Sequence, residues 1–283
     1  MKKIALPLSF IVLFFVSSCE YFNLDSEDDG LSTDDIIEGL KTALEIGTDS
    51  STAVLSAING YYLDELVKIP LPDEAIKVQN DINAVLSLAP SLSSYLNLDT
   101  QFENVVKSIN RAAENAAKEA APIFGDAIRS MTISQGWDIL NGIVPSDSAT
   151  KSADFDSTAA TEFFKIKTYG ALTDLYAPKI DSVLDKDLGL GFSANQAWTT
   201  LRTTYNSAVN TITGNIITNS VLNLTGYSLD PLETESIGVF ATEKALDGLF
   251  FKVGEEEKKI RKDPFQWAVD IIQKVFGYIQ DHI

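Results

Sequence analysis

The sequence predicts an all-α protein in which a single multi-helix domain makes up most of the chain. After Ser32, most apolar residues recur at intervals of three and four, the spacing that places side chains on one face of a helix. Residues that suit helix caps stand where these stripes begin, and glycines or prolines stand where they end. Only Gly214–Gly226, rich in Thr and Asn, has strand-like composition, so we expect one irregular or hairpin insertion there.

The first predicted helix begins after Ser32, whose hydroxyl suits an N-cap, and ends at Gly47. A second, short helix is expected over Asp49–Ile58. The segment Ile69–Pro72 contains two prolines, and each disfavours helical geometry in the residue before it, so this segment is expected to be extended. A helix over Asp73–Leu88 follows.

The strongest helical pattern covers Asp99–Ala121. Its apolar face is maintained over five turns by Phe102, Val105, Val106, Ile109, Ala112, Ala113, Ala116, Ala117 and Ala120. The alanines indicate close approach to a neighbouring helix, and Pro122 is expected to start a new one.

Later helices are predicted over Ser134–Leu140, Ala159–Leu172, Pro178–Leu184, Ser193–Ile212, Val239–Lys262 and Phe265–Gln280. Gly142 and Gly248 are expected to relieve helix ends or tight crossings. Neither a linker nor a convincing repeat interrupts residues 31–283, and about 250 residues is near the upper limit for one core. We therefore predict one domain over residues 31–283.

The composition excludes several classes of function. Forty Asp and Glu against 22 Lys and Arg give a formal net charge of −18, which repels a nucleic-acid backbone. One Cys and one His leave no cysteine zinc cluster, multi-His metal site or disulfide framework, and exclude most His-assisted nucleophiles. We expect no nucleic-acid partner, no metal and no cofactor, which leaves carboxylate chemistry or no chemistry.

The N-terminus has the pattern of a signal peptide. A basic start, Lys2-Lys3, precedes the apolar run Ile4–Val16, which is too short for a comfortable membrane span. Val16-Ser17-Ser18-Cys19 resembles the bacterial lipobox, in which the cysteine is lipidated on its sulfur and becomes the new N-terminus. Residues 1–18 are thus a predicted lipoprotein signal peptide, and Cys19 is the predicted lipidation site. An uncleaved anchor helix and a plain secretory signal are the alternatives.

Residues 19–30 are acidic and have no apolar periodicity, so we expect a solvated tether between the lipid and the domain. The acyl chains on Cys19 would hold the chain on a lipid bilayer without protein contacts. Glu20 follows Cys19 where an Asp would resemble an inner-membrane retention signal. This resemblance to known sorting signals favours a bacterial cell envelope protein anchored in the outer membrane, on a face that stays open.

Motifs from about Leu31 to Gly277 resemble a known family. They are Leu31–Thr33, Gly39–Leu44, Ile69–Pro72, Asn110–Glu114, Met131-Thr132, Ile139–Gly142, Ala159–Phe164, Thr242–Phe250 and Glu255–Pro264. Together they resemble the bacterial family called domain of unknown function 4197. The resemblance implies an exported, largely helical protein and brings no activity with it. Pro145–Asp156 and Gly214–Gly226 depart from the family pattern, and we expect both to be surface insertions.

The first candidate site is Asn110-Arg111-x-x-Glu114. With Ile109 at the centre of the buried stripe, Asn110 falls near its edge, while Arg111, Glu114 and Lys118 fall on the opposite side. Glu114 and Lys118 are then expected to form a solvated pair, an interpretation favoured over a recognition site. Asn110 is the better candidate, because an amide at a helix seam usually bonds to something specific.

The second candidate site lies in the run Glu255–Lys262. Helical spacing pairs Glu255 with Lys259 and Glu257 with Arg261, and a charged, exposed face is the favoured interpretation. Three consecutive carboxylates point about 100° apart, so they cannot converge on one cation. Arg129 and Thr161 complete the set of putative binding residues, Asn110, Arg111, Glu114, Arg129, Thr161, Glu257 and Arg261. Their gathering in one pocket would favour a binding site, and their scattering would favour structural roles.

Three functions follow as hypotheses. The favoured one is a non-catalytic, membrane-tethered module that binds an unknown envelope protein or a small ligand. The first alternative is a carrier of an apolar small ligand in a cavity of roughly 300 to 1,000 Å³. The second is a carboxylate-dependent glycan hydrolase with Glu114 and Glu257 as candidate acids. Trp137, Trp198 and Trp267 could line its sugar cleft, although helical spacing places these aromatics more simply in the core.

Overall fold

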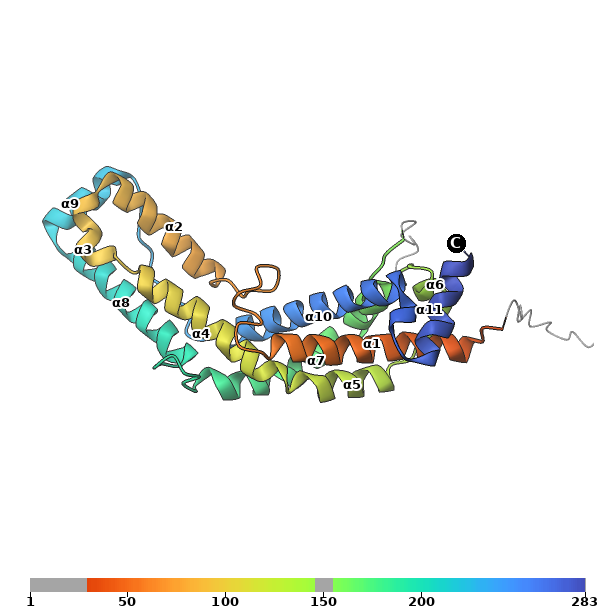
Figure 1. Ribbon diagram of the computed structural model, residues 1–283. Helices are drawn as coiled ribbons and strands as arrows, with labels where there is room; N and C mark the ends of the chain where they lie inside the picture. The colour runs from red at the N-terminus through yellow and green to blue at the C-terminus, as the bar shows by residue number, and fades with distance from the viewer. Residues whose placement is uncertain (1–29, 146–154, 283) are drawn as a thin grey trace, which may run out of the picture. The chain divides into compact units, whose positions relative to one another are not determined.

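Helices form all the regular structure of the described part of the chain (Figure 1). The computed structural model describes residues 30–145 and 155–282, and these contain eleven α-helices, two short 3₁₀ helices and no strand. They are α1 (Thr33–Leu55), α2 (Asp73–Leu88), η1 (Pro90–Leu92), α3 (Ser93–Leu96), α4 (Asp99–Ala117), α5 (Ala120–Ser130), α6 (Gly136–Leu140), α7 (Ala159–Leu184), α8 (Ala194–Gly214), α9 (Ile216–Thr225), α10 (Gly238–Lys262), η2 (Pro264–Gln266) and α11 (Asp270–His282). The predicted all-α class is confirmed.

Some sequence predictions fall outside the described residues. The expected signal peptide, Cys19 and nearly all of the acidic tether belong to residues 1–29. Most of the expected insertion Pro145–Asp156 also lies outside them. Within the described residues, no helix combines the length and the apolar character needed to cross a membrane.

Helix α1 begins as predicted but does not end at Gly47. The Ser32 hydroxyl accepts a hydrogen bond from the Asp35 amide at 3.1 Å, and the Asp35 carboxylate accepts one from the Ser32 amide at 3.0 Å. The helix then continues through Gly47 to Leu55. A Cβ at Gly47 would lie 3.2 Å from a Val253 methyl on α10, so this glycine permits a close helix crossing and does not end a helix.

Two predicted helices are one in the structure. Helix α7 runs from Ala159 to Leu184 with Pro178 inside it, where a break had been expected. Pro178 is on the exposed side, while Tyr176 and Ile180 on either side of it are buried. The packing of these two side chains therefore keeps the helix continuous despite the lost amide donor.

The expected irregular or hairpin insertion is a helix. Helix α9 covers Ile216–Thr225 within Gly214–Gly226. The Asn215 side chain accepts hydrogen bonds from the amides of Ile217 and Thr218, and Gly226 ends the helix at φ 73°. Asn215 thus serves as a helix cap, a role that composition alone could not distinguish from a place in a strand or hairpin.

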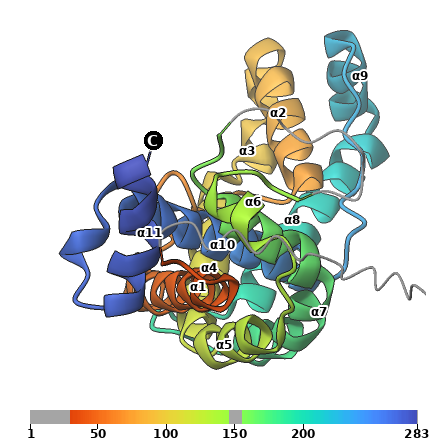
Figure 2. The same ribbon diagram turned by 90° about the vertical axis from the view of Figure 1, so that its right-hand side faces the viewer.

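The helices pack in two groups that α4 joins. In the first, α10 packs along both α1 and α7, and α5 packs against α1 and α7. In the second, α8 packs against α4, α9 and α3. Helix α4 contacts α7 and α10 as well as α8, so it links the two groups (Figures 1 and 2). Residues Leu31–Ile283 accordingly form one compact unit.

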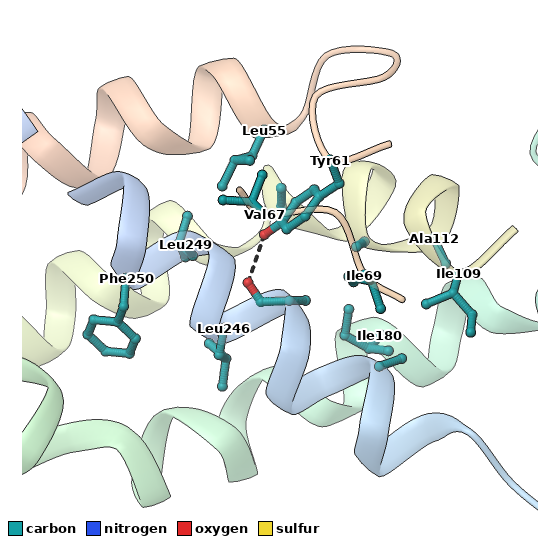
Figure 3. Packing of buried hydrophobic residues seen from close by; sticks show 14 of the residues in the cluster. Leu55, Tyr61, Val67, Ile69, Ile109, Ala112, Ile180, Leu246, Leu249 and Phe250 are labelled. Atoms are coloured by element: carbon teal, nitrogen blue, oxygen red, sulfur yellow. Dashed lines mark hydrogen bonds between the residues drawn. The ribbon is translucent and has the colours of Figure 1, made fainter. Parts of the chain in front are cut away.

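Tyr61 fixes the segment after α1 against α10 (Figure 3). Its ring is fully buried, and its hydroxyl donates a hydrogen bond to the carbonyl of Ala245 at 2.8 Å. A Cβ at Gly248 would lie 2.8 Å from the Tyr61 ring, which confirms that this glycine relieves a tight contact. Burial raises the pKa of the Tyr61 phenol well above its ordinary value, so the hydroxyl stays a donor.

Candidate functional site

Asn110 holds an extended segment in place. Its side chain is fully buried, and Nδ2 donates to the carbonyl of Ile69 while Oδ1 accepts from the amide of Ile69, at 2.7 and 2.8 Å. Nδ2 also donates to the carbonyl of Val106 at 2.7 Å. The amide thus pairs with the backbone of Ile69 as a neighbouring strand would, and it fixes the extended segment Ile69–Pro72 against α4. The expected specific partner of Asn110 is this backbone.

Glu114 is buried, which corrects the prediction of a solvated pair with Lys118. Only 2% of Glu114 is exposed, and its Oε1 accepts hydrogen bonds from the amides of Tyr61 and Tyr62 at 3.3 and 3.1 Å. Its Oε2 lies 2.9 Å from Nη1 of Arg111. Arg111 neutralises the carboxylate. The carboxylate in turn accepts hydrogen bonds from two amides of the turn after α1 that would otherwise be unpaired. The helical projection failed because the segment after α1 covers this side of α4.

Glu257 and Thr161 meet at the start of α7. The Glu257 carboxylate, 1% exposed, accepts hydrogen bonds from the amides of Ala160 and Thr161 at 3.0 and 2.7 Å. The Thr161 hydroxyl donates to the same carboxylate at 2.7 Å. Arg261, one turn along α10, donates to Glu257 at 2.8 Å and to the carbonyls of Leu140 and Ile139 at 2.8 and 2.9 Å.

The predicted exposed face of Glu255–Lys262 is therefore only partly correct. Glu257 and Arg261 do pair at helical spacing, but they are buried. The start of α7 covers Glu257, and the end of α6 covers Arg261. The pairing of Glu255 with Lys259 is wrong. Glu255 pairs with Lys258 at 2.7 Å, and Lys259 pairs with Glu256.

Arg129 stands apart from the other candidates. It is exposed at the end of α5, where Nη2 pairs with Asp126 at 2.7 Å and Nη1 with Glu45 at 3.2 Å. The hydrogen bond from its guanidinium to Asp126 raises the pKa of Arg129, so the guanidinium stays protonated. The seven candidates thus occupy three separate places, and those on α4, α7 and α10 hold backbone segments together. Scattering of this kind favours structural roles.

A groove between α5 and α7 has the geometry of a binding site. Its volume is about 640 Å³, and its walls are mostly apolar. The apolar lining comprises Ile123, Ala127, Met131, Ala171, Leu172 and Leu175. Asp126, Ser130, Thr132, Lys167 and Thr168 add polar groups. The sequence analysis did not predict this groove. Apolar residues of α7 outside its buried stripe, such as the exposed Leu175, were the signal that could have indicated it.

The charges at this groove are unevenly matched. Asp126 is paired with Arg129, so its negative charge is neutralised locally. The Lys167 ammonium lies 5.7 Å from the centre of the Phe163 ring. Among residues 30–145 and 155–282, no carboxylate pairs with Lys167. The groove therefore carries a positive charge that has no acidic partner within the described residues, in a chain with a net charge of −18.

Helix α9 presents a second unusual surface. Ile216, Ile217 and Leu224 are 86%, 75% and 88% exposed, and spacings of seven and eight residues place them on one face. The sequence contains no charged residue from Thr203 to Leu229. A solvent-facing helix side that is apolar and lies in an uncharged stretch is atypical of a surface helix.

In the described residues, no three His, Cys, Asp or Glu side chains gather closely enough to hold a metal ion.

Comparison with known proteins identifies a family from the sequence. The family model described as "Protein of unknown function (DUF4197)" matches residues 30–277. No curated protein and no solved structure matches the chain.

Proposed function

The chain belongs to the DUF4197 family of proteins of unknown function, and we propose that it is a membrane-tethered, non-catalytic binding module of the bacterial cell envelope. Its ligand is an apolar molecule of small size. The groove between α5 and α7 carries this proposal, because its mostly apolar walls and volume of about 640 Å³ fall within the range of small-ligand sites. This proposal combines two of the hypotheses from the sequence, the membrane-tethered binding module and the carrier of an apolar small ligand.

The tether rests on the N-terminal sequence. The lipobox-like Val16–Cys19 follows a basic start and a short apolar run, and Cys19 is the chain's single cysteine. Several acyl chains on Cys19 would keep the helical domain at a bilayer, each buried CH₂ contributing roughly 0.8 kcal/mol. The acidic residues between Cys19 and Gly30 would let the domain stand off from the lipid. Mass spectrometry of the native protein, showing acylated Cys19 as the first residue, tests this part.

The buried positions of the candidate acids argue for binding without catalysis. A glycan hydrolase needs two reachable carboxyl groups on either side of the bond that is broken. Glu114 and Glu257 are almost entirely buried, and backbone amides and arginines already occupy their oxygens. Substrate does not reach either group in this arrangement.

A matched pair of variants tests the groove. Ala171 is an exposed residue in the groove wall, so Ala171→Trp fills the groove at little cost to the fold. Ala53→Trp adds the same side chain at an exposed position of α1. Full-length chains are placed in phosphatidylcholine vesicles, and binding of labelled decanol is measured against empty vesicles. Wild type and Ala53→Trp should bind more decanol than Ala171→Trp, and equal binding by all three contradicts the proposal.

Helix α9 favours a second candidate function, association with a second copy of this chain. The uncharged stretch Thr203–Leu229 lets two strongly acidic chains approach without direct repulsion, and one apolar face can serve both partners of a symmetric pair. Energy transfer between differently labelled chains in dilute vesicles measures this. Leu224→Asp should abolish the transfer, and Leu63→Asp, at another exposed leucine, should not. No transfer in the wild-type chain contradicts it.

A further inference from the structure

The polar groups at the α5–α7 groove indicate which class of apolar ligand it takes. We propose that the ligand is a single-chain amphiphile with a carboxylate head, whose aliphatic chain lies in the groove and whose head pairs with Lys167. This inference rests on the proposed function, since it requires that the groove binds a ligand.

The first step is the shape and chemistry of the groove. Two helices form its walls, with Ile123 and Ala127 on α5 facing Ala171 and Leu175 on α7. Small side chains at two of these positions leave room between the helices for a chain of methylene groups. An aliphatic chain has no polar atoms, so walls of this composition leave none of its atoms unpaired.

The second step is the charge. Lys167 lines the groove, and its exposed ammonium has no carboxylate partner among the described residues. The groove's acid, Asp126, is already paired with Arg129 at 2.7 Å. A ligand with one negative charge would complete the pair that Lys167 lacks, whereas a cationic head would meet the same charge as its own.

The third step distinguishes a carboxylate from a phosphate head. A phosphate monoester carries nearly two negative charges near neutral pH, and the groove offers one cation that no described residue neutralises, Lys167. A monocarboxylate therefore matches the charge of this groove better than a phosphate does.

The experiment compares three probes of equal chain length, decanoate, decanol and decyl phosphate, at pH 8 and low salt. Full-length chains in phosphatidylcholine vesicles are used, with empty vesicles as the blank. We expect decanoate to bind most tightly to the wild-type chain, and its advantage over decanol to shrink as salt is added. The variant Lys167→Gln should weaken decanoate roughly three- to fivefold and leave decanol unchanged, as an exposed ion pair implies.

Lys244→Gln is the matched control, because Lys244 is an exposed lysine on α10 that does not line the groove. It should leave all three affinities unchanged. The inference is overturned if decanol binds in the groove as well as decanoate, if decyl phosphate binds more tightly than decanoate, or if Lys167→Gln has no effect. In those cases groove-dependent decanol binding still supports the proposed function. Loss of all groove-dependent binding, judged with Ala171→Trp, contradicts both.

Discussion

Arg261 donates its Nε–H to the carboxylate of Glu257 at 2.8 Å, and both side chains are buried at a point where two helices meet. The carboxylate lies at the first amides of α7, and the guanidinium lies at the last carbonyls of α6. Each charge therefore stands at the helix end whose dipole it complements. One ion pair on α10 thus fixes the end of one helix and the start of another.

Glu257→Ala should lower the free energy of unfolding by about 3–5 kcal/mol, because it leaves Arg261 buried without a counter-charge and the start of α7 without its acceptor. Urea unfolding followed by circular dichroism measures the change. The matched control is Glu255→Ala, which removes a partly exposed pair with Lys258 and should cost less than about 1 kcal/mol. Equal effects of the two substitutions would contradict the structural role of Glu257.

Asn110→Ala should release the segment Ile69–Pro72 from α4. It removes three hydrogen bonds and leaves the amide and carbonyl of Ile69 buried without partners, which costs about 1–3 kcal/mol. Hydrogen exchange at the Ile69 amide should accelerate more than exchange along α7. Asn83→Ala, at an exposed position of α2, serves as the control and should change neither. Unchanged protection at Ile69 would show that Asn110 does not hold this segment.

Gly248→Ala should destabilise the protein by about 1–3 kcal/mol, because the added methyl group would meet the Tyr61 ring at 2.8 Å inside the core. Gly170→Ala is the opposite case, since a Cβ there meets nothing within 4 Å and a helical alanine is favoured over glycine by roughly 0.5–1 kcal/mol. Thermal unfolding of the two variants should therefore shift in opposite directions. A rise in melting temperature for Gly248→Ala would be inconsistent with the packing around Tyr61.

Asp35 should make stability depend on pH below about 4. Hydrogen bonds from Lys274 and Ser32 lower the pKa of its carboxyl from 3.8 to about 2. The unfolded chain therefore takes up this proton first, and the contribution of Asp35 is complete above about pH 4 and lost as the pH falls through 2. Asp35→Asn should reduce this slope in acid unfolding curves, while Asp64 and Glu74, whose pKa values are also lowered, keep part of it. Asp34→Asn, at the preceding exposed position, should retain it.

The sequence predicted a helix well where a single apolar face determines which of its residues are buried. The alternating threes and fours of Asp99–Ala121 identified the apolar core residues of α4, but α4 ends at Ala117 and Ala120 already starts α5 ahead of Pro122. Asp73–Leu88 matches α2 residue for residue. Helix ends were less certain. Gly47 is a residue type that often ends a helix, but here it lies inside α1 and permits the close approach of α10. Pro178 lies inside α7, which tertiary packing keeps continuous. A glycine that ends a helix and one that admits a neighbour look alike in a single sequence.

The same limit applies to the charged candidates. The chain gives the spacing of Glu257 with Arg261, and this pair forms, whereas Glu114 pairs with Arg111 and not with the expected Lys118. It does not give their burial, because the covering segments come from residues 50 to 120 positions away in the sequence. The α5–α7 groove was missed for a related reason. A groove is the space that two distant helices leave open, and no local pattern encodes the distance between them.

The hydrogen bonds of Glu257 also bear on when the chain can reach its native state. The carboxylate that starts α7 comes from a residue 97 positions later than the amide it binds, and the acceptor of the Tyr61 hydroxyl comes 184 positions later. Neither of these two hydrogen bonds can form during synthesis before the C-terminal quarter of the chain has left the ribosome. Closing such long loops also slows folding. The packing of α10 against α1 and α7 is thereby postponed until late in synthesis.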